Sequence, residues 1–467
     1  MSENYISRRG YTINKKNLNE KEINKIKKDL FVQPFEKQKF LMEKFGNLPP
    51  KFKVYLESQN KFYLPRYYGI QNFGNAKNNI VNKGENINLK FTGKLRQNQI
   101  EIMNEFMPKF FKEKGGILNL KTGLGKTALA LYLISKIQKK TLVVVHKEFL
   151  MNQWRDRINK FLPDAKVGII QSKKVIVENC DIVIGMLQSI SLRNYDKNIF
   201  EGFGFTVLDE IHNFGSEVYS QAFPKISAEL NLGLSATLKR KDNMEKILLW
   251  SIGFAFTPNN KNNKGFGAVK CLNVLFNDSE NQVTYYNYNG NINYPKMINK
   301  LSESQKRKEL IIKFIKKLCL NKRKILVLSE RRNQLNELKK SLDFIKIESG
   351  MCVGGVKQKE LDENVKKQVL LATYSYVQEA FDVQMLNTII LATPKSDVVQ
   401  AIGRILRQTE EQRTHIPLIV DIVDNTERMK KKYNTRKKYY KQNNFDIIDY
   451  EKDKSIDLEF KNNLKII

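Results

Sequence analysis

The stretch Leu120–Thr127, which reads Leu-Lys-Thr-Gly-Leu-Gly-Lys-Thr, most constrains how this chain of 467 residues can fold. It lies between a short apolar run and a helical pattern that begins at Ala128. This strand–loop–helix context is typical of a phosphate-binding loop, because glycines let several backbone N–H groups close around phosphate oxygens at a helix N-terminus. The residues predicted to hold the phosphates are Thr122, Gly123, Leu124, Gly125, Lys126 and Thr127.

Within this loop, two side chains have specific predicted roles. Lys126 is placed to reach the β- and γ-phosphates of a nucleotide, and the Thr127 hydroxyl is placed to bind Mg²⁺. The loop departs from the usual motif at one position, because Leu120 replaces the glycine that normally opens it.

The balance of charge indicates a polyanionic partner. The chain has 81 Lys and Arg residues against 49 Asp and Glu, a formal net charge of +32. Nucleic acid is the leading candidate for a protein this basic, although a lysine-rich composition inherited from an AT-rich genome would give the same excess. There is no run of eighteen apolar residues and no apolar core of a secretory signal, so we expect no membrane association and no secretion.

The four cysteines and three histidines do not form metal-ligand patterns. No Cys-x-x-Cys pair occurs, and the histidines are widely separated. We therefore expect reduced core thiols rather than a zinc site or a redox motif.

The pattern of apolar runs predicts an α/β protein with two tandem parallel-sheet lobes. In both lobes short apolar strands alternate with helical patterns, which favours parallel sheets covered by helices. The predicted segments are an N-terminal accessory domain at 1–92, the first lobe at 93–257, a linker or small subdomain at 258–300, the second lobe at 301–427 and a basic tail at 428–467. The tail interleaves lysine and arginine with tyrosine, which fits either a nucleic-acid contact or a solvated charged helix.

Two adjacent acids, Asp209 and Glu210, end an apolar strand of the first lobe. Phosphoryl transfer to water needs a metal ligand and a group that orients the attacking water. We predict that Asp209 binds Mg²⁺ and that Glu210 activates the water.

A third element, Gln400–Arg407, lies in the second lobe, which has no phosphate-binding loop of its own. Arg404 and Arg407 are three residues apart and would share one face of a helix. Guanidinium groups bind phosphate oxygens in a bidentate way and suit the role of arginine fingers, whereas the alternative is an exposed basic face.

Taken in order, these elements resemble the motifs of the superfamily 2 helicases of the DExH type. The matching stretches are Leu95–Gln99, Gly123–Thr127, His146–Leu150 with Gln153-Trp154, Asp209–His212, Ser235–Thr237, Ala372-Thr373 through Glu379–Asp382, and Gln400–Arg407. The resemblance implies two RecA-like lobes with ATP in the cleft between them. One position departs from the family pattern, because Ala380 replaces a glycine, and this requires a backbone that avoids positive φ.

A closer resemblance is to the helicases of large nucleocytoplasmic DNA viruses. It rests on Ile390–Asp397, Val420–Asn425 and Pro65–Ile70. That group includes the poxvirus transcript-release helicase, and it is related to a repair and transcription helicase and to phage branch-migration helicases. The resemblance implies a monomeric, ATP- and Mg²⁺-dependent enzyme that moves 3′ to 5′ on DNA, at a single strand or a duplex junction. It also implies a virion or a virus factory in the host cytoplasm, with a viral RNA polymerase as a candidate partner.

The resemblance also assigns residues. Gln99 is expected to read adenine together with Arg96, Asp382 to contact the nucleotide, and Gln400 to act in catalysis. The expected nucleic-acid contacts are His146, Lys147, Ser329, Arg331, Thr373 and Lys395.

Several alternatives stay open. The motifs do not separate a DNA helicase from a duplex translocase or an RNA helicase, because backbone contacts serve both nucleic acids. A non-catalytic nucleic-acid-binding factor on a helicase fold is disfavoured by the presence of Lys126, Asp209, Glu210, Arg404 and Arg407. Transcript release, elongation, repair and recombination are not distinguished.

Overall fold

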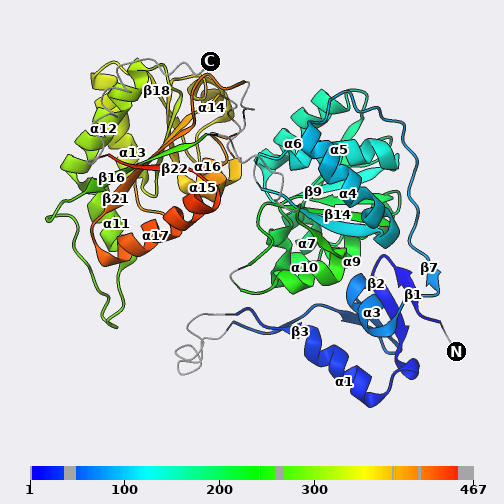
Figure 1. The fold of residues 1–467 in the computed structure, drawn as a ribbon. Helices are drawn as coiled ribbons and strands as arrows, with labels where there is room; N and C mark the ends of the chain where they lie inside the picture. Colours follow the sequence, from blue (N-terminus) through cyan, green and yellow to red (C-terminus); the bar gives the residue numbers. More distant parts are fainter. Residues whose placement is uncertain are drawn as a thin grey trace. The chain divides into compact units, whose positions relative to one another are not determined.

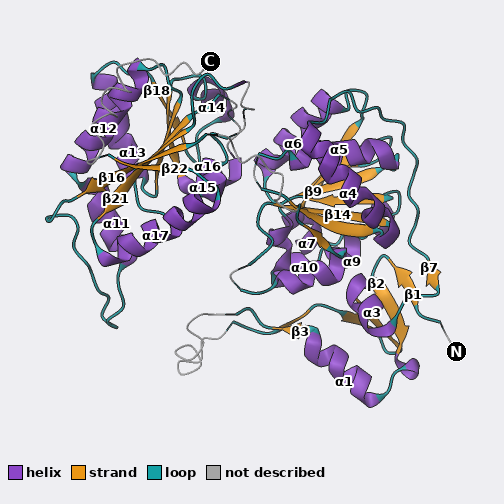
Figure 2. Ribbon diagram, in the orientation of Figure 1, coloured by secondary structure: helices purple, strands orange, loops and turns teal. Residues whose placement is uncertain are grey.

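The computed structural model describes residues 3–35, 49–121, 123–240, 242–258, 268–380, 383, 385–406, 408 and 412–450. The chain forms two compact units, Met1–Lys261 and Asn262–Ile467. Figures 1 and 2 show helices and strands in both units.

The first unit begins with a small accessory domain built on a five-stranded sheet. Its strand order is β5-β6-β2-β1-β7. The strands are β1 (Tyr5–Ser7), β2 (Gly10–Asn14), β5 (Leu56–Glu57), β6 (Lys61–Leu64) and β7 (Asn78–Asn79). The other elements are η1 (Lys15–Asn17), α1 (Glu20–Asp29), α3 (Arg66–Phe73) and a separate strand pair, β3 (Phe31–Val32) with β4 (Phe52–Lys53).

The main part of the first unit is an eight-stranded sheet in the order β11-β10-β12-β9-β13-β14-β8-β15. All neighbouring strands are parallel except β10 and β11. The strands are β8 (Gly115–Asn119), β9 (Thr141–Val145), β10 (Val167–Gln171), β11 (Lys174–Ile176), β12 (Ile182–Met186), β13 (Phe205–Leu208), β14 (Leu230–Ser235) and β15 (Ala255–Phe256). The helices are α4 (Gln97–Glu113), α5 (Lys126–Ile137), α6 (Glu148–Phe161), α7 (Leu187–Leu192), α8 (Glu217–Ser220), α9 (Phe223–Ile226) and α10 (Glu245–Ile252), with η2 (Lys197–Phe200) and η3 (Ile211–Gly215).

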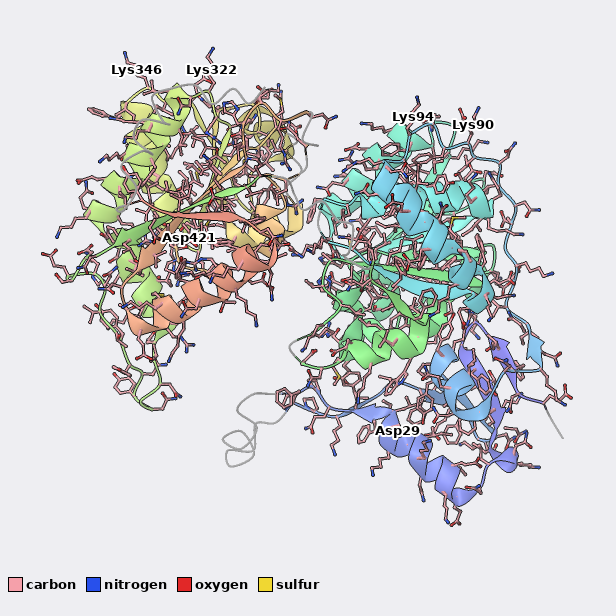
Figure 3. The ribbon with its side chains drawn as sticks, viewed as in Figure 1. Asp29, Lys90, Lys94, Lys322, Lys346 and Asp421 are labelled. Atoms are coloured by element: carbon pink, nitrogen blue, oxygen red, sulfur yellow. The ribbon has the colours of Figure 1, made fainter. Side chains whose placement is uncertain are left out.

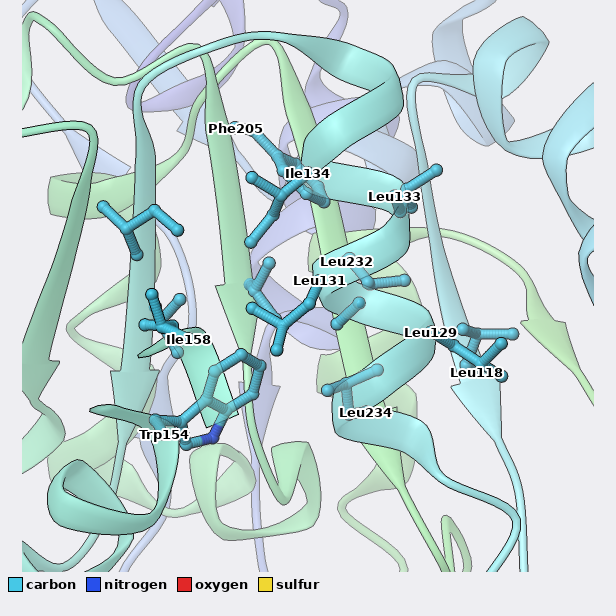
Figure 4. Close-up of a cluster of buried hydrophobic side chains, with 14 of the residues drawn as sticks. Leu118, Leu129, Leu131, Leu133, Ile134, Trp154, Ile158, Phe205, Leu232 and Leu234 are labelled. Carbon is cyan, nitrogen blue, oxygen red and sulfur yellow. The ribbon is translucent and has the colours of Figure 1, made fainter. Parts of the chain in front are cut away.

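Helix α5 packs along one face of this sheet because most of its residues are apolar. Leu129, Leu131 and Ile134 of α5 are fully buried. In Figure 4, Leu129 lies beside Leu118 of β8, Leu131 beside Leu232 of β14 and Ile134 beside Phe205 of β13, so the helix that follows the phosphate-binding loop packs over the sheet.

The accessory domain is tied to the main sheet through α3. The Arg66 guanidinium donates to the carbonyl oxygens of Glu229 (3.0 Å) and Ala228 (2.7 Å), and the Tyr67 hydroxyl donates to the Glu113 carbonyl (2.8 Å). Because Arg66 is buried, these bonds replace its lost hydration.

The second unit has a sheet of seven strands, all parallel, in the order β18-β19-β17-β20-β21-β16-β22. The strands are β16 (Lys270–Phe276), β17 (Ile325–Ser329), β18 (Ser349–Cys352), β19 (Val369–Thr373), β20 (Thr388–Leu391), β21 (Leu418–Asp424) and β22 (Asp446–Asp449). The helices are α11 (Tyr294–Glu303), α12 (Gln305–Leu320), α13 (Arg332–Phe344), α14 (Gln358–Asn364), α15 (Tyr374–Ala380), α16 (Val399–Ile402) and α17 (Glu427–Gln442).

Two layers of helices cover opposite faces of this second sheet. Ile325 and Val327 of β17 pack in the same core as α12, whereas Leu326 and Leu328 pack in the core that includes Tyr440 of α17. Since successive strand residues point to opposite faces, α12 and α17 lie on different sides of the sheet.

The predicted parallel sheets covered by helices are confirmed, but two predicted boundaries are wrong. The segment 258–300 contains β16, which pairs with β21 over its full length and is therefore part of the second sheet. The segment 428–467 contains most of α17 and all of β22, and β22 pairs with β16. Both segments read as separate from the lobe because neither follows the simple alternation of strand and helix.

None of the helices within the described residues is both long and apolar enough to span a membrane.

Candidate functional site

The phosphate-binding loop follows β8 and leads directly into α5. Gly123 and Gly125 have φ values of 89° and 80°, in the left-handed region that favours glycine. Leu120 is fully buried in the core, and its N–H donates to the Ser235 carbonyl (2.9 Å). The apolar residue in place of the usual glycine therefore extends the packing of β8 and does not need a glycine backbone.

The side chain of Gln99, in α4, contacts the phosphate-binding loop. Its Oε1 accepts from the Arg96 N–H (2.9 Å), and its Nε2 donates to the Leu124 carbonyl (3.0 Å). A Cβ atom on Gly125 would lie 2.4 Å from this Nε2. Both ends of the Gln99 amide thus make hydrogen bonds within the protein, so Gln99 positions the loop, and its contact with adenine stays a prediction. Arg96 is exposed.

Lys126 and Thr127 lie in the first turn of α5. The Lys126 ammonium donates to the Leu120 carbonyl (3.3 Å), and Thr127 is half-buried. Thr122 lies outside the described residues.

The acid pair lies at the carboxyl end of β13, two strands from β8. Asp209 Oδ2 accepts from Trp154 Nε1 (2.8 Å), and Asp209 Oδ1 accepts from the Glu210 N–H (3.0 Å). Glu210 has φ 46°, a left-handed conformation that turns its carboxylate away from the strand direction. Glu210 Oε2 is buried without a hydrogen-bond partner among the described residues.

The electrostatics of this pair favour a bound cation. Burial, and then the negative charge of Glu210, raise the pKa of Asp209, while the Trp154 hydrogen bond and the charge of Lys126 lower it. The buried Asp209 carboxylate, with the partly buried Glu210 beside it, thus lies near the Lys126 ammonium, and a divalent cation would compensate the remaining negative charge. Within the described chain, no three His, Cys, Asp or Glu side chains form a ready-made metal site. The Asp209 carboxylate and Thr127 hydroxyl suit Mg²⁺, with phosphate oxygens completing its shell.

Residues after the acid pair connect it to β14. His212 Nδ1 lies 3.3 Å from Ser235 Oγ and 3.4 Å from Glu210 Oε2. Burial and the charge of Arg240 lower the pKa of His212 to about 4, so the ring is neutral at neutral pH. The Arg240 guanidinium also donates to the His212 carbonyl. His212 therefore lies between the end of β14 and the Glu210 carboxylate.

Two of the expected nucleic-acid contacts lie in the first unit, after β9. His146 is partly buried, and its Nδ1 has no hydrogen-bond partner among the described residues. Burial lowers the pKa of His146 to about 4. Lys147 immediately precedes α6 at its N-terminus.

In the second unit, Gln400 and Arg404 are only partly buried, but the predicted helix is shorter than expected. Helix α16 ends at Ile402, and Arg404 follows in a turn, where its Nε donates to the Val377 carbonyl (3.1 Å). The replacement of glycine by Ala380 is accommodated, because that residue belongs to helix α15. Asp382 and Arg407 lie outside the described residues.

The expected contacts Ser329 and Arg331 of the second unit are engaged inside the protein. Ser329 is fully buried, donates to Gln334 Oε1 (2.7 Å) and accepts from the Arg331 N–H (2.9 Å). Its side chain is therefore not available to a phosphate, contrary to the prediction. The Arg331 guanidinium binds Asn299 Oδ1 (2.5 Å) and the Pro295 carbonyl (3.1 Å), so it holds α11 to the end of β17.

Thr373 and Lys395 remain accessible. Thr373 ends β19 and is half-buried. Lys395 is 32 % exposed, and its ammonium lies 2.8 Å from Glu330 Oε1.

Sequence reasoning did not identify the role of Trp154, although it singled out the residue. Trp154 is fully buried in α6, and its indole N–H is the direct partner of Asp209. A buried tryptophan needs an acceptor for its N–H. The sequence does not show that this acceptor lies 55 residues away.

The chain is similar to known proteins over most of its length. Residues 92–240 match the family described as the type III restriction enzyme res subunit. The chain is 34% identical over 460 residues to a candidate ATP-dependent RNA helicase, L396, of Acanthamoeba polyphaga mimivirus, covering 95% of this chain and 86% of that protein. It is 28% identical to a candidate ATP-dependent RNA helicase, QP509L, of African swine fever virus, over 75% of this chain and 73% of the relative. It is 27% identical to a candidate helicase, 161L, of Invertebrate iridescent virus 6, over 83% of this chain and 89% of the relative.

The fold and the phosphate-binding loop beside an acid pair define an α/β nucleotide-binding protein. The chain belongs to the ATP-dependent helicase family of large DNA viruses.

Proposed function

We propose that this chain is an ATP-driven nucleic-acid motor, most specifically a monomeric 3′-to-5′ DNA helicase of superfamily 2. The observation that carries the proposal is the acid pair. Asp209 is buried and lies within electrostatic reach of Lys126, and the adjacent Glu210 keeps a buried carboxylate oxygen without a hydrogen-bond partner among the described residues. Such an arrangement is suited to a metal–phosphate complex and is costly without one.

In this mechanism the first unit binds ATP, and the second unit supplies arginine. The loop amides and Lys126 hold the phosphates, Gln99 keeps the loop in shape, and Thr127 and Asp209 hold Mg²⁺. The bound Mg²⁺ would neutralise charge on the phosphates during transfer. Glu210 orients the attacking water, and Arg404 and Arg407 stabilise the transition-state charge.

Hydrolysis is coupled to movement because both units contact one nucleic-acid strand. His146, Lys147, Thr373 and Lys395 are the proposed contacts, and the link from Glu210 through His212 to Ser235 conveys the state of the γ-phosphate. We propose action on DNA in transcript release or in repair, inside a virion or a virus factory, with a viral RNA polymerase as partner.

A second candidate is an RNA helicase, or a duplex translocase that does not separate strands. Two relatives carry RNA helicase in their names. ATP hydrolysis measured side by side with single-stranded DNA, duplex DNA and RNA separates the candidates. Strand displacement on 3′- and 5′-tailed duplexes then gives polarity. We expect DNA to stimulate ATP hydrolysis and strands to be displaced only from duplexes with 3′ tails. Stimulation of hydrolysis by RNA alone would mean that the substrate is RNA and not DNA. Absence of stimulation by any nucleic acid would contradict a motor function.

A further inference from the structure

A projecting hairpin in the second unit carries two tyrosines in contact with solvent. Residues 283–293, here called the tyrosine hairpin, form an antiparallel bridge between Tyr286 and Ile292. The turn is closed by the Asn287 N–H on the Asn291 carbonyl (2.7 Å) and the Gly290 N–H on the Asn287 carbonyl (2.9 Å). It is therefore an ordered projection, visible in Figure 1 as the loop that precedes α11.

The two tyrosines do not stabilise the fold. Tyr288 is fully exposed and Tyr286 is 65% exposed. There is no acidic residue between positions 281 and 302. Two uncovered aromatic rings on an acid-free projection are suited to stacking against bases, since every base offers a π-face.

The base of the hairpin packs on α17. Tyr285 and Tyr294, at its two ends, contact a small core formed by Met297, Ile298 and Leu301 of α11 with Met429 of α17. The Lys432 ammonium lies 3.5 Å from the centroid of the Tyr294 ring. The hairpin and α17 are therefore neighbours within the same unit.

Helix α17 is anchored by its buried side and charged on its exposed side. Arg436 is buried and makes a bidentate pair with Asp421 (2.7 and 2.8 Å), which also accepts from the Tyr440 hydroxyl (2.8 Å). Figure 3 labels Asp421 in the second unit. The exposed cations of the helix are Arg428, Lys430, Lys431, Lys438 and Lys441.

These exposed cations have little compensation. Glu427 is the sole acid in α17, and it pairs with Lys431. Like charges one helical turn apart repel each other, and a polyanion would remove this repulsion. The buried Arg436–Asp421 pair holds the helix to β21, whereas Lys430, Lys438 and Lys441 lie on its exposed side.

Arg436 also connects α17 to Lys395, which is one of the proposed nucleic-acid contacts. Arg436 Nη1 donates to the Lys395 carbonyl (2.6 Å), and the Tyr294 hydroxyl donates to the neighbouring Pro394 carbonyl (2.8 Å). The backbone at Pro394 and Lys395 is thus held by both α17 and the end of the tyrosine hairpin.

We propose that the tyrosine hairpin and the exposed face of α17 form an additional binding surface for single-stranded nucleic acid. The tyrosines stack on bases, and the lysines contact phosphates. This inference rests on the proposed motor function and adds a strand-binding site to it.

The test separates stacking from charge with two variants and matched controls. The stacking variant is Tyr286→Ala with Tyr288→Ala, and its control is Phe344→Ala, another exposed aromatic residue of this unit. The charge variant is Lys430→Gln, Lys438→Gln and Lys441→Gln. Its control removes three exposed lysines from α12, on the other face of the sheet, as Lys306→Gln, Lys313→Gln and Lys316→Gln.

Binding of the full chain to fluorescein-labelled oligothymidine and to an abasic strand of equal length is measured by anisotropy over a salt series. The stacking variant should bind oligothymidine about tenfold more weakly but the abasic strand as wild type does, and Tyr→Phe at both positions should restore binding. The charge variant should weaken binding to both strands, with a salt slope smaller by roughly 2. Both controls should bind as wild type does.

Basal ATP hydrolysis without nucleic acid should be unchanged in every variant, because the substituted residues lie outside the nucleotide site. Wild-type affinity and salt slope in the stacking and charge variants, with hydrolysis still stimulated by nucleic acid, would overturn this inference and leave the motor function standing. Equal losses in the controls would also overturn it. A wild-type protein that is not stimulated by any nucleic acid would instead contradict the motor function.

Discussion

Both units bury an aspartate at a parallel sheet, but Asp421 of the second unit is paired with a buried arginine, whereas Asp209 of the first is not. In the second unit, Asp421 is paired with Arg436 through two hydrogen bonds and accepts a third from Tyr440. In the first unit, Asp209 accepts from an indole and a backbone amide, and the adjacent Glu210 keeps one buried oxygen without a hydrogen-bond partner among the described residues. Removing one partner of a buried ion pair leaves an uncompensated charge and destabilises the fold, whereas a buried acid without a countercharge is suited to a ligand that brings positive charge.

The largest expected effect tests whether Asp209 and Glu210 take part in ATP hydrolysis. Glu210→Gln keeps the size of the side chain but removes its negative charge, and we expect ATP hydrolysis to fall by about a thousandfold or more. Lys126→Ala should do the same by removing the phosphate contact. The measurement is steady-state ATP turnover with saturating nucleic acid. Wild-type turnover in both purified variants would refute the assignment.

The next effect tests whether the satisfied pair supports the fold. Asp421→Asn leaves the buried Arg436 without its countercharge, and we expect the second unit to lose about 3–5 kcal/mol of stability. Denaturant unfolding, followed by circular dichroism, measures the loss. Adding Arg436→Met should recover most of it, because no charge then remains buried. An unchanged unfolding midpoint in Asp421→Asn would show that the pair does not stabilise the unit.

Replacing aspartate by asparagine should lower stability at Asp421 but raise it at Asp209. The pKa of Asp209 is higher in the folded protein than in the unfolded chain. Protonated Asp209 therefore contributes stability that is lost as the pH rises above the normal pKa range of an aspartate. Without nucleotide and metal, Asp209→Asn should therefore stabilise the first unit by about 1–3 kcal/mol at neutral pH while it abolishes activity. Thermal unfolding at pH 5 and pH 8 provides the comparison. A loss of stability at pH 8 would mean that Asp209 is structurally satisfied after all.

The smallest expected effect concerns histidines. His146 has a pKa of about 4 in the folded protein, below its value in the unfolded chain, so stability should decrease as the pH falls from about 6.5 to about 4. His146→Gln should reduce this pH dependence by about 1 kcal/mol. In the second unit, His415 Nε2 lies 2.9 Å from the Asn321 carbonyl. Identical stability profiles for His146→Gln and wild type between pH 4 and 7 would contradict the lowered pKa.

The strands with continuous apolar runs could be predicted from sequence, and the segments at the margins of the second unit could not. Strands such as β9 and β13 are apolar because helices cover both faces of the sheet, so their composition identifies them. The strand β22, with the sequence Asp-Ile-Ile-Asp, is too short and polar to be recognised without its partner β16. Its assignment depends on pairing across the sequence, which a local pattern does not contain.

The site shows the same limit. The loop at Gly123–Thr127 and the acid pair were recognisable because glycine spacing and adjacent acids are local features. The role of Arg436 was not, because it is one of many cations in α17 and only its burial distinguishes it. Gln99 was recognised as important, but its hydrogen bond to the loop depends on tertiary packing that the sequence does not show.

The position of β16 between β21 and β22 has a consequence for synthesis of the protein on the ribosome. The first unit uses strands that emerge before residue 260, so its sheet can form while the rest of the chain is translated. In the second unit, the edge of β16 stays uncovered until β22 is made, about 170 residues later, which is roughly 10–35 s at ordinary elongation rates. During that interval a nascent chain presents an unpaired strand, a template for aggregation, and a product terminated after β21 would keep it permanently.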